Sequence, residues 1–147
     1  MPEGDYTVPI GIAAVRREGK DLTIVTCGGM VLKADAAAET LKQKGIDTEI
    51  VDLRSLAPLD KQAILKSVAK TKQAIVLDEG PMVGGLSAEI AALIQENLFS
   101  DLRGPVLRIA AQPIPPPHSP PLVDAMIPDV DQIVEAVMRL AEGGKAH

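Results

Sequence analysis

The residues of this sequence that could take part in chemistry lie where its apolar runs end. They form four short groups: Cys27-Gly28-Gly29, Asp52 with Arg54, Asp78-Glu79, and Gly84-Gly85. A cysteine at a helix start can act as a thiolate nucleophile, and carboxylates beside an arginine can transfer protons or form ion pairs. Glycines that lead into a helix can bind an anion through their backbone N–H groups. Each group also has a structural interpretation.

The glycine pairs favour tight turns over phosphate binding. Gly28-Gly29 does not fit the pattern G-x-G-x-x-G, and nothing in the chain resembles G-x-x-x-x-G-K-[ST]. Both nucleotide-binding fingerprints therefore fail, and we interpret Gly28-Gly29 as a strand-to-helix turn. Gly84-Gly85 has the same interpretation, with anion binding as the alternative.

Cys27 lacks the partner that a catalytic thiol needs. Its general base would have to be a histidine, and the chain contains only His118 and His147, the second of which is the last residue. We therefore interpret Cys27 as a small buried residue.

The charged groups favour a structural or interface role. Asp52 with Arg54 and Asp78 with Glu79 could form an acid–base cluster, but polar residues commonly end strands to form ion pairs or to cap the next helix. No group of His, Cys, Asp and Glu in the sequence has metal-ligand spacing. The residues alone therefore predict no catalytic, cofactor-binding or metal-binding site.

These groups are predicted to lie at one edge of a parallel sheet. Short apolar runs alternate with helical periodicity, which is typical of a sheet covered by helices. The predicted strands with this pattern are residues 22–27, 48–53, 73–77 and 105–109. Ligands of open α/β sheets bind beyond the carboxyl ends of the strands. These ends carry Cys27-Gly28-Gly29, residues 52–54, residues 78–80 and the residues from Ala110 onward.

Helix boundaries can also be predicted from the sequence. The helix after Gly29 is predicted to stop at Gly45, and Asp60 is placed to cap the next helix. A third helix follows Gly84-Gly85. The last helix begins at Asp129, where Gln132 three residues on completes a capping-box pattern.

A fifth strand is predicted at residues 11–15. Residues 16–20 turn too tightly for a helical crossover, so this strand runs against the others. We predict a three-layer α/β/α sandwich with a mostly parallel, five-stranded mixed sheet whose first strand is antiparallel.

Composition excludes several classes of partner. A chain of 147 residues is most simply one domain, and its net charge of -5 argues against nucleic acid and anionic membranes. Tyr6 and Phe99 are the only aromatic residues, so no platform for base stacking exists. One cysteine fits a reducing compartment, and no apolar run suits a membrane span or a signal peptide. We expect a cytoplasmic protein, or a mitochondrial matrix protein in a eukaryote.

Six prolines lie between residues 113 and 121, in the sequence PIPPPHSPP. A linker or a ligand for an SH3-type domain would also be rich in proline. However, the helix that follows is needed to cover the sheet. We predict a stiff arm on the surface, since proline fixes φ and lowers the entropy cost of ordering a long connection.

The order of six segments resembles one known domain. They are YTVPIG (6–11), LTIVTCGGMV (22–31), VDLRSLAPLD (51–60), DEGPMVGGLSAEIAALI (78–94), PVLRI (105–109) and IPDVDQIVEAV (127–137). Together they resemble the C-terminal, transketolase-like domain of the β subunit of the decarboxylating component of 2-oxo acid dehydrogenases, of the pyruvate and branched-chain type. The resemblance implies a linker remnant at residues 1–10, the domain at 11–142 and a flexible tail at 143–147.

The resemblance implies a cofactor that this domain does not bind alone. In the family, the α chain holds the diphosphate and magnesium of thiamine diphosphate, and the N-terminal domain of the β subunit holds its pyrimidine ring. The sequence has no Gly-Asp-Gly motif with a following Asn to bind magnesium diphosphate. We expect the N-terminal domain to precede this chain in a longer subunit, and the chain alone to be inactive.

The resemblance also implies an assembly role. In the family this domain packs against the α subunit and the second β subunit of a heterotetramer, and in several members it docks the subunit-binding domain of the acyltransferase core. The interface residues implied here are Arg54, Glu79, Met82, Gly84, Gly85, Pro115, Pro116, Pro117 and His118. An isolated domain would expose this surface, so we expect a weak homodimer.

The sequence departs from the family pattern at several of these places. Cys27 stands where an aromatic residue is common, and Asp78 where a histidine often precedes the glutamate. Gln112 and His118 replace an acidic residue and a tyrosine. Two alternatives stay open: the equivalent domain of transketolase or deoxyxylulose-phosphate synthase, and a free-standing interaction module. The segment VDLRSLAPLD favours the dehydrogenase over the other thiamine enzymes.

Overall fold

A five-stranded sheet forms the centre of the computed structural model, which describes residues 7–141. The strands are β1 (Ala14–Arg17), β2 (Leu22–Thr26), β3 (Thr48–Asp52), β4 (Ala74–Pro81) and β5 (Leu107–Ala111), in the order β1-β3-β2-β4-β5. β1 runs antiparallel to β3, and the other neighbouring strands are parallel. The predicted mixed sheet is therefore confirmed. The predicted tail at 143–147 and residues 1–6 of the predicted linker lie outside the described residues.

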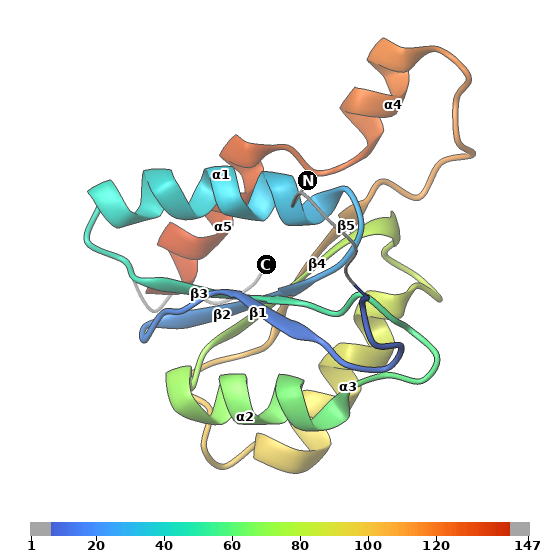
Figure 1. The fold of residues 1–147 in the computed structure, drawn as a ribbon. Coiled ribbons are helices and arrows are strands. Elements are labelled where there is room, and N and C mark those ends of the chain that lie inside the picture. The colour runs from blue at the N-terminus through green and yellow to red at the C-terminus, as the bar shows by residue number, and fades with distance from the viewer. Residues whose placement is uncertain (1–6, 142–147) are drawn as a thin grey trace.

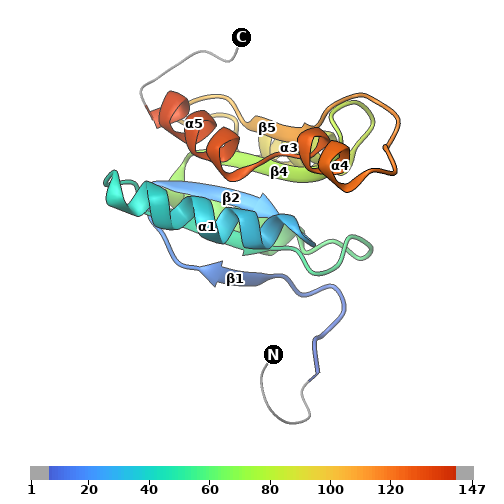
Figure 2. The same ribbon diagram turned by 90° about the horizontal axis from the view of Figure 1, so that it is seen from above.

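Helices cover both faces of the sheet (Figure 1). They are α1 (Met30–Gln43), α2 (Lys61–Thr71), α3 (Leu86–Leu98), α4 (Pro120–Met126) and α5 (Val130–Ala141). α1 and α5 contact each other on one face, which Figure 2 shows from above, and α2 and α3 contact each other on the other face. The three-layer sandwich predicted from the sequence is therefore confirmed.

The central strands build two separate cores because successive side chains of a strand point to opposite faces. The in-register layers are Ile24 with Ile50 and Ile75, and Val25 with Val51 and Val76. The isoleucines pack towards α1 and α5, and the valines towards α2 and α3. All six are at most 1% exposed. Each such side chain contributes roughly 1.5–3 kcal/mol of burial free energy, so these layers fix the strand register.

Three predicted helix ends are confirmed. Asp60 Oδ1 accepts a hydrogen bond from Ala63 N at 3.0 Å at the start of α2. At the start of α5, Asp129 Oδ1 accepts from Gln132 N at 2.8 Å, and Gln132 Oε1 accepts from Asp129 N at 3.2 Å. Gly45, just after α1, has a φ of 83°, which glycine adopts without strain.

The prediction of the first strand at residues 11–15 is wrong in its bounds. β1 lies further along the chain, and the two arginines predicted to form the turn belong to the strand. They are extended because this segment pairs with β3, and both side chains also reach carboxylates of α1; local sequence reveals neither tertiary contact. The pairs are Arg16 Nε with Asp35 Oδ2 at 3.1 Å, and Arg17 Nη1 with Glu39 Oε1.

The proline-rich segment is not an extended arm throughout, and that prediction is wrong from Pro120 onward. Pro120 and Pro121 take the first positions of α4. Proline suits this place because its φ fits a helix and its missing N–H would have no partner there. Leu122 N and Val123 N both donate to Ser119 O at 3.0 Å. α4 buries none of its residues and projects from the layers at the upper right of Figure 1.

A polar network joins the β1–β2 turn, β3 and α2. Glu49 is 1% exposed and accepts hydrogen bonds from Ser67 Oγ at 2.5 Å, from Gly19 N at 3.2 Å and from Lys70 Nζ. Thr23 Oγ1 lies 2.9 Å from Ser67 Oγ. Because the carboxylate has several donors, its burial is tolerated, and it ties the turn to the sheet.

Candidate interface at the carboxyl edge of the sheet

The four parallel strands end at the same edge of the sheet. We call the segments that follow them the carboxyl edge: residues 27–29 after β2, 53–60 after β3, 82–85 after β4 and 112–119 after β5. The candidate groups lie at this edge as predicted, although Asp52 is the last residue of β3, and Asp78 and Glu79 belong to β4, which continues to Pro81. The edge therefore brings residues from four distant parts of the sequence onto one side of the molecule.

Asp78 caps the helix that follows it. Its side chain is buried, and Oδ2 accepts a hydrogen bond from Ser87 N at 3.1 Å in the first turn of α3, while Oδ1 accepts from Gly80 N at 2.8 Å. Gly85 at the N-cap has no side chain to do this, so Asp78 supplies the missing acceptor and a negative charge at the helix N-terminus. Its role is therefore structural.

Gly84-Gly85 forms the tight turn that the sequence predicts. Gly84 has a φ of 72°, in the left-handed region that favours glycine. A Cβ atom on Gly85 would lie 2.0 Å from Pro81 O, so no larger residue fits without moving the backbone. Because the Asp78 carboxylate already binds an N–H group of this helix start, an anion is disfavoured there.

Glu79 lies against the other glycine turn. Its carboxylate oxygens Oε1 and Oε2 are 3.6 Å and 3.4 Å from the positions that a Cβ would take on Gly28 and Gly29. Gly28 has a φ of 61°. A carboxylate beside the N-terminus of α1 is favourable because the helix dipole is positive at that end. The turn is therefore filled by the protein's own anionic side chain.

The surroundings of Cys27 disfavour a thiolate. Burial of the half-buried side chain raises the pKa of the thiol, and the negative charges of Asp78, Glu79 and Asp52 raise it further. The side chain packs against the core beside α2 and α3. The interpretation of Cys27 as a packing residue is supported over that of a nucleophile.

Arg54 forms the predicted ion pair with Asp52. Arg54 N donates to Asp52 Oδ1 at 3.1 Å, and Arg54 Nε lies 4.0 Å from Asp52 Oδ2. The backbone of Arg54 has a φ of 55°, an uncommon conformation for a residue with a side chain. Strain of this kind is held by the surrounding structure and gathers at functional surfaces. The guanidinium stays partly exposed, and its part in an interface stays a prediction.

The other implied interface residues lie at the same edge. Pro115, Pro116 and His118 are exposed, and Pro117 is half-buried. Met82 is half-buried in the β4–α3 loop. Their part in an interface stays a prediction.

Sequence reasoning missed a second property of the carboxyl edge, namely its exposed apolar side chains. Val83 is 81% exposed in the β4–α3 loop. Leu56 and Ile114 are also exposed at this edge, and Leu32 and Leu122 are exposed in the first turns of the helices α1 and α4 that follow it. The signal in the sequence that could have revealed this exposure is the position of these apolar residues between glycines and prolines. Exposed apolar surface is a common feature of contact sites, and its role here stays a prediction.

Two other kinds of site are absent from the part of the chain that the structure describes. Among residues 7–141, no group of three or more His, Cys, Asp and Glu side chains could hold a metal ion. Within the same residues, no helix combines the length and apolarity needed to cross a membrane.

The fold and this edge can now be compared with known proteins. The family model described as the C-terminal domain of transketolase matches residues 11–133. The chain belongs to this family. Membership confirms the resemblance seen in the sequence.

Several relatives of this transketolase C-terminal domain are β subunits, and these subunits are longer than this chain. It is 41% identical over 145 residues to the acetoin:2,6-dichlorophenolindophenol oxidoreductase subunit beta of Cupriavidus necator, and 39% over 143 residues to the 2-oxoisovalerate dehydrogenase subunit beta of Bacillus subtilis. It is 38% identical over 141 residues to the mitochondrial pyruvate dehydrogenase E1 component subunit beta of Dictyostelium discoideum. The matches cover 99%, 97% and 96% of this chain and 43%, 44% and 40% of the relatives. The chain thus spans about two fifths of the length of the curated relatives it matches.

A solved structure shares the fold. It is titled "Split gene transketolase, inactive beta4 tetramer" and is 28% identical, with a TM-score of 0.73. The match covers 92% of this chain and 43% of that chain. The transketolase C-terminal domain described here therefore has relatives among both β subunits and a transketolase.

Proposed function

We propose that this chain is the C-terminal assembly domain of the β subunit of a thiamine-diphosphate-dependent 2-oxo acid dehydrogenase, of the pyruvate or branched-chain type. The observation that carries the proposal is the carboxyl edge, which combines exposed apolar side chains with the partly exposed Arg54. Identities of 38 to 41% to β subunits, against 28% to the split-gene transketolase, favour the dehydrogenase over the transketolase alternative. Residues 11–142 form the proposed unit.

In this proposal the domain holds subunits together, and the chemistry takes place elsewhere in the parent complex. The residues of the carboxyl edge do not fit a diphosphate, because Glu79 lies against Gly28-Gly29 and Asp78 binds the start of α3. Thiamine diphosphate and magnesium would bind between the α subunit and the rest of the β subunit. This domain alone would bind neither.

The proposed partners are those that the resemblance to the family implies. They are the α subunit and the second β subunit of a heterotetramer, and the subunit-binding domain of the acyltransferase. The proposed compartment is the cytoplasm, or the mitochondrial matrix in a eukaryote.

The acetoin relative gives a second candidate for the reaction of the parent. At 41% identity, the Cupriavidus necator β subunit is as similar to this chain as the dehydrogenase subunits are. Reconstitution with the α subunit and the remaining part of the β subunit distinguishes the two candidate reactions. Turnover of pyruvate or branched-chain 2-oxo acids supports the dehydrogenase, and turnover of acetoin alone supports the second candidate. Turnover by the 147-residue chain by itself would contradict an assembly role.

Assembly can be tested by one substitution at the carboxyl edge. We expect Val83→Asp to weaken association of the full β subunit with the α subunit by about 2 kcal/mol, because it places a charge in a desolvated contact. Sedimentation velocity at several concentrations measures the change. In the isolated chain the same substitution should remove the expected weak homodimer.

Phe99→Asp is the matched control. Phe99 is 77% exposed, close to the 81% of Val83, but it follows the C-terminus of α3, whereas Val83 precedes the N-terminus of that helix. We expect it to leave association unchanged. Equal weakening by both substitutions would show that the carboxyl edge is not the contact surface.

A further inference from the structure

The two edge strands of the sheet differ in how they are protected from pairing with another chain. At β1 the register shifts between Val15 and Arg17, and both arginines of the strand bind carboxylates of α1. Bulges and charges of this kind block the addition of a further strand. β5 pairs with β4 in regular register from Leu107 to Ile109, and the register shift that follows comes from extra residues of β4 between Leu77 and Pro81, not from β5. No described strand lies on the other side of β5. Its outer N–H and C=O groups are therefore available to a partner.

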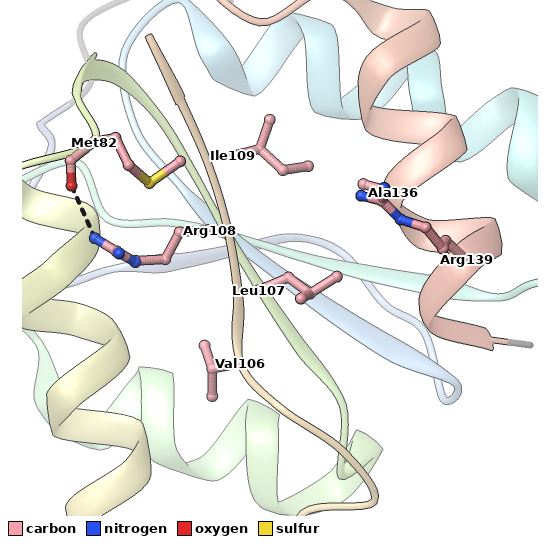
Figure 3. A pocket seen from close by; sticks show the side chains of 7 residues that line it. All are labelled: Met82, Val106, Leu107, Arg108, Ile109, Ala136 and Arg139. Atoms are coloured by element: carbon pink, nitrogen blue, oxygen red, sulfur yellow. Dashed lines mark hydrogen bonds between the residues drawn. The ribbon is translucent and has the colours of Figure 1, made fainter. Parts of the chain in front are cut away.

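A groove runs along this free edge (Figure 3). It has a volume of about 320 Å³, and its apolar lining includes Leu107, Ile109, Ala136 and Met82. A second hollow of about 260 Å³ shares Ile109, Ala136 and Met82 and continues along α5 to Gln132. Leu107 and Ile109 are only half-buried, unlike the residues of the central strands. The edge thus combines unused backbone groups with apolar surface.

Two arginines flank the edge on opposite sides. In Figure 3, Arg108 points to the side of α3, where its Nη1 donates to Met82 O at 2.8 Å. Arg139 comes from α5 on the other side, towards which Leu107 and Ile109 also point. Glu135 is the one carboxylate among the described residues that line the two hollows. The groove is therefore locally cationic, although the chain has a net charge of -5.

We propose that the outer edge of β5 binds an extended peptide segment of a partner protein, which adds a sixth strand to the sheet and carries acidic side chains. Successive side chains of a strand point to opposite faces, so acidic residues at two adjacent positions would reach Arg108 and Arg139, one on each side. Apolar residues of the segment would pack on Leu107 and Ile109. This mode of recognition combines backbone hydrogen bonds for affinity with side-chain contacts for specificity.

A second copy of this chain fits the edge less well. Two β5 strands paired antiparallel across a twofold axis would bring the Arg108 side chains of both copies onto the same side of the sheet, and like charges on neighbouring strands are destabilising. The proposed peptide site goes beyond the assembly role at the carboxyl edge. Met82 is the only implied interface residue that also lines the groove.

The probe is an acetylated octapeptide of threonine and valine with two adjacent glutamates at its centre. Amide hydrogen exchange and ¹⁵N–¹H shifts of the 147-residue chain report where it binds. We expect slowed exchange and shifted signals in β5. The same peptide with lysines in place of the glutamates should bind at least about fivefold more weakly, and the glutamate peptide with alternate backbone nitrogens methylated should not protect β5.

Charge-reversal substitutions on the protein are the second part of the test. Arg139→Glu should weaken binding of the glutamate peptide and strengthen binding of the lysine peptide. Lys20→Glu makes the same charge change in the β1–β2 turn, near the other edge of the sheet, and should alter neither. Leu56→Asp, at an exposed position of the carboxyl edge that β2 and β4 separate from β5, should weaken assembly and leave peptide binding intact, which separates this proposal from the assembly role.

Three results would overturn the proposal. The first is that the glutamate peptide leaves β5 exchange unchanged. The second is that the glutamate and lysine peptides bind equally. The third is that β5 becomes protected without peptide as the protein concentration rises, because the occupant would then be a second copy of this chain.

Discussion

At the scale of single residues, the surroundings of a side chain decide its chemistry more than its type does. The thiol of Cys27 lies at a helix start, a place that often activates cysteine. Burial and the three nearby carboxylates act in the opposite direction and raise the pKa of the thiol. Asp78, one of those carboxylates, is itself engaged by Ser87 N and Gly80 N. Asp78 thus stabilises the start of α3 and, together with Glu79 and Asp52, disfavours the thiolate of Cys27.

Alkylation of Cys27 should therefore be slow. We expect iodoacetamide to modify the folded chain more slowly at neutral pH than it modifies a free cysteine, because less thiolate is present when the pKa is raised. Mass spectrometry of quenched samples measures the rate. Glu79→Gln should increase it by removing one negative charge, and the urea-unfolded chain should react at the rate of a free cysteine. A folded rate equal to the unfolded rate would contradict the prediction.

Loss of the Asp78 side chain should destabilise the fold. Asp78→Ala removes two hydrogen bonds and leaves the buried N–H of Ser87 without its acceptor. We expect the free energy of unfolding to fall by about 2–3 kcal/mol, measured by urea denaturation. Asp124→Ala, at an exposed position of α4, is the control and should change it by less than about 0.5 kcal/mol.

At the scale of elements, the ion pairs in and beside β1 are expected to weaken as the pH falls. The hydrogen bond and charge of Arg17 hold the pKa of Glu39 below its usual range, and the hydrogen bond of Lys70 does the same for Glu18 beside β1. A carboxylate whose pKa is lower in the folded than in the unfolded chain contributes stability above the ordinary glutamate range. That contribution is lost as the pH falls through the lowered pKa.

Glu39→Gln should therefore reduce the loss of stability in acid. We expect the urea midpoints of the variant and the parent to converge as the pH falls below the ordinary glutamate range. Glu96→Gln, at an exposed position of α3, should leave the acid dependence of the parent unchanged. Parallel curves for Glu39→Gln and the parent would show that the pair with Arg17 contributes nothing.

The elements that local sequence determines were predictable, and those that depend on tertiary contacts were not. The caps at Asp60 and Asp129 follow from spacing along the chain, and the alternation of apolar residues predicts the central strands. The bounds of β1 depend on contacts of its arginines with α1, some twenty residues away. α4 was missed because dense prolines argue against a helix unless they fall in its first turn, as Pro120 and Pro121 do.

The candidate site was predictable to a similar extent. Strand ends place Arg54 and Glu79 at one edge, because carboxyl ends of parallel strands meet there. The cap formed by Asp78 required knowledge of which helix start lies beside it. The exposure of Val83 and Ile114 is a property of the folded surface, and apolar residues in a sequence are more often buried.

At the scale of the whole molecule, two candidate contact surfaces lie on different sides of the sheet. The carboxyl edge follows the ends of the strands, and the groove follows the outer side of β5. Met82 lies where they meet. The proposed subunit contact and the proposed peptide contact therefore use different surfaces, which share only Met82 among the residues named.

The arm should matter more for assembly than for folding. Replacing Pro115, Pro116 and Pro117 with alanine frees three backbone angles that an interface must then order, at roughly 0.4–1 kcal/mol for each residue. We expect weaker association with the α subunit by sedimentation and little change in the urea midpoint of the isolated chain. Equal losses in both measurements would show that the arm is purely structural.

The excursion from Gln112 to Met126 begins and ends at the same place. Gln112 N donates to Met126 O at 3.1 Å, and Gln112 Nε2 donates to Ala125 O at 3.4 Å. α4 within it buries no residue. A segment closed at its base can be lengthened, shortened or exchanged without disturbing the layers, because the entropy cost of closing a loop grows slowly with its length. The length and sequence of residues 112–126 can therefore change while the layers of the domain keep their packing.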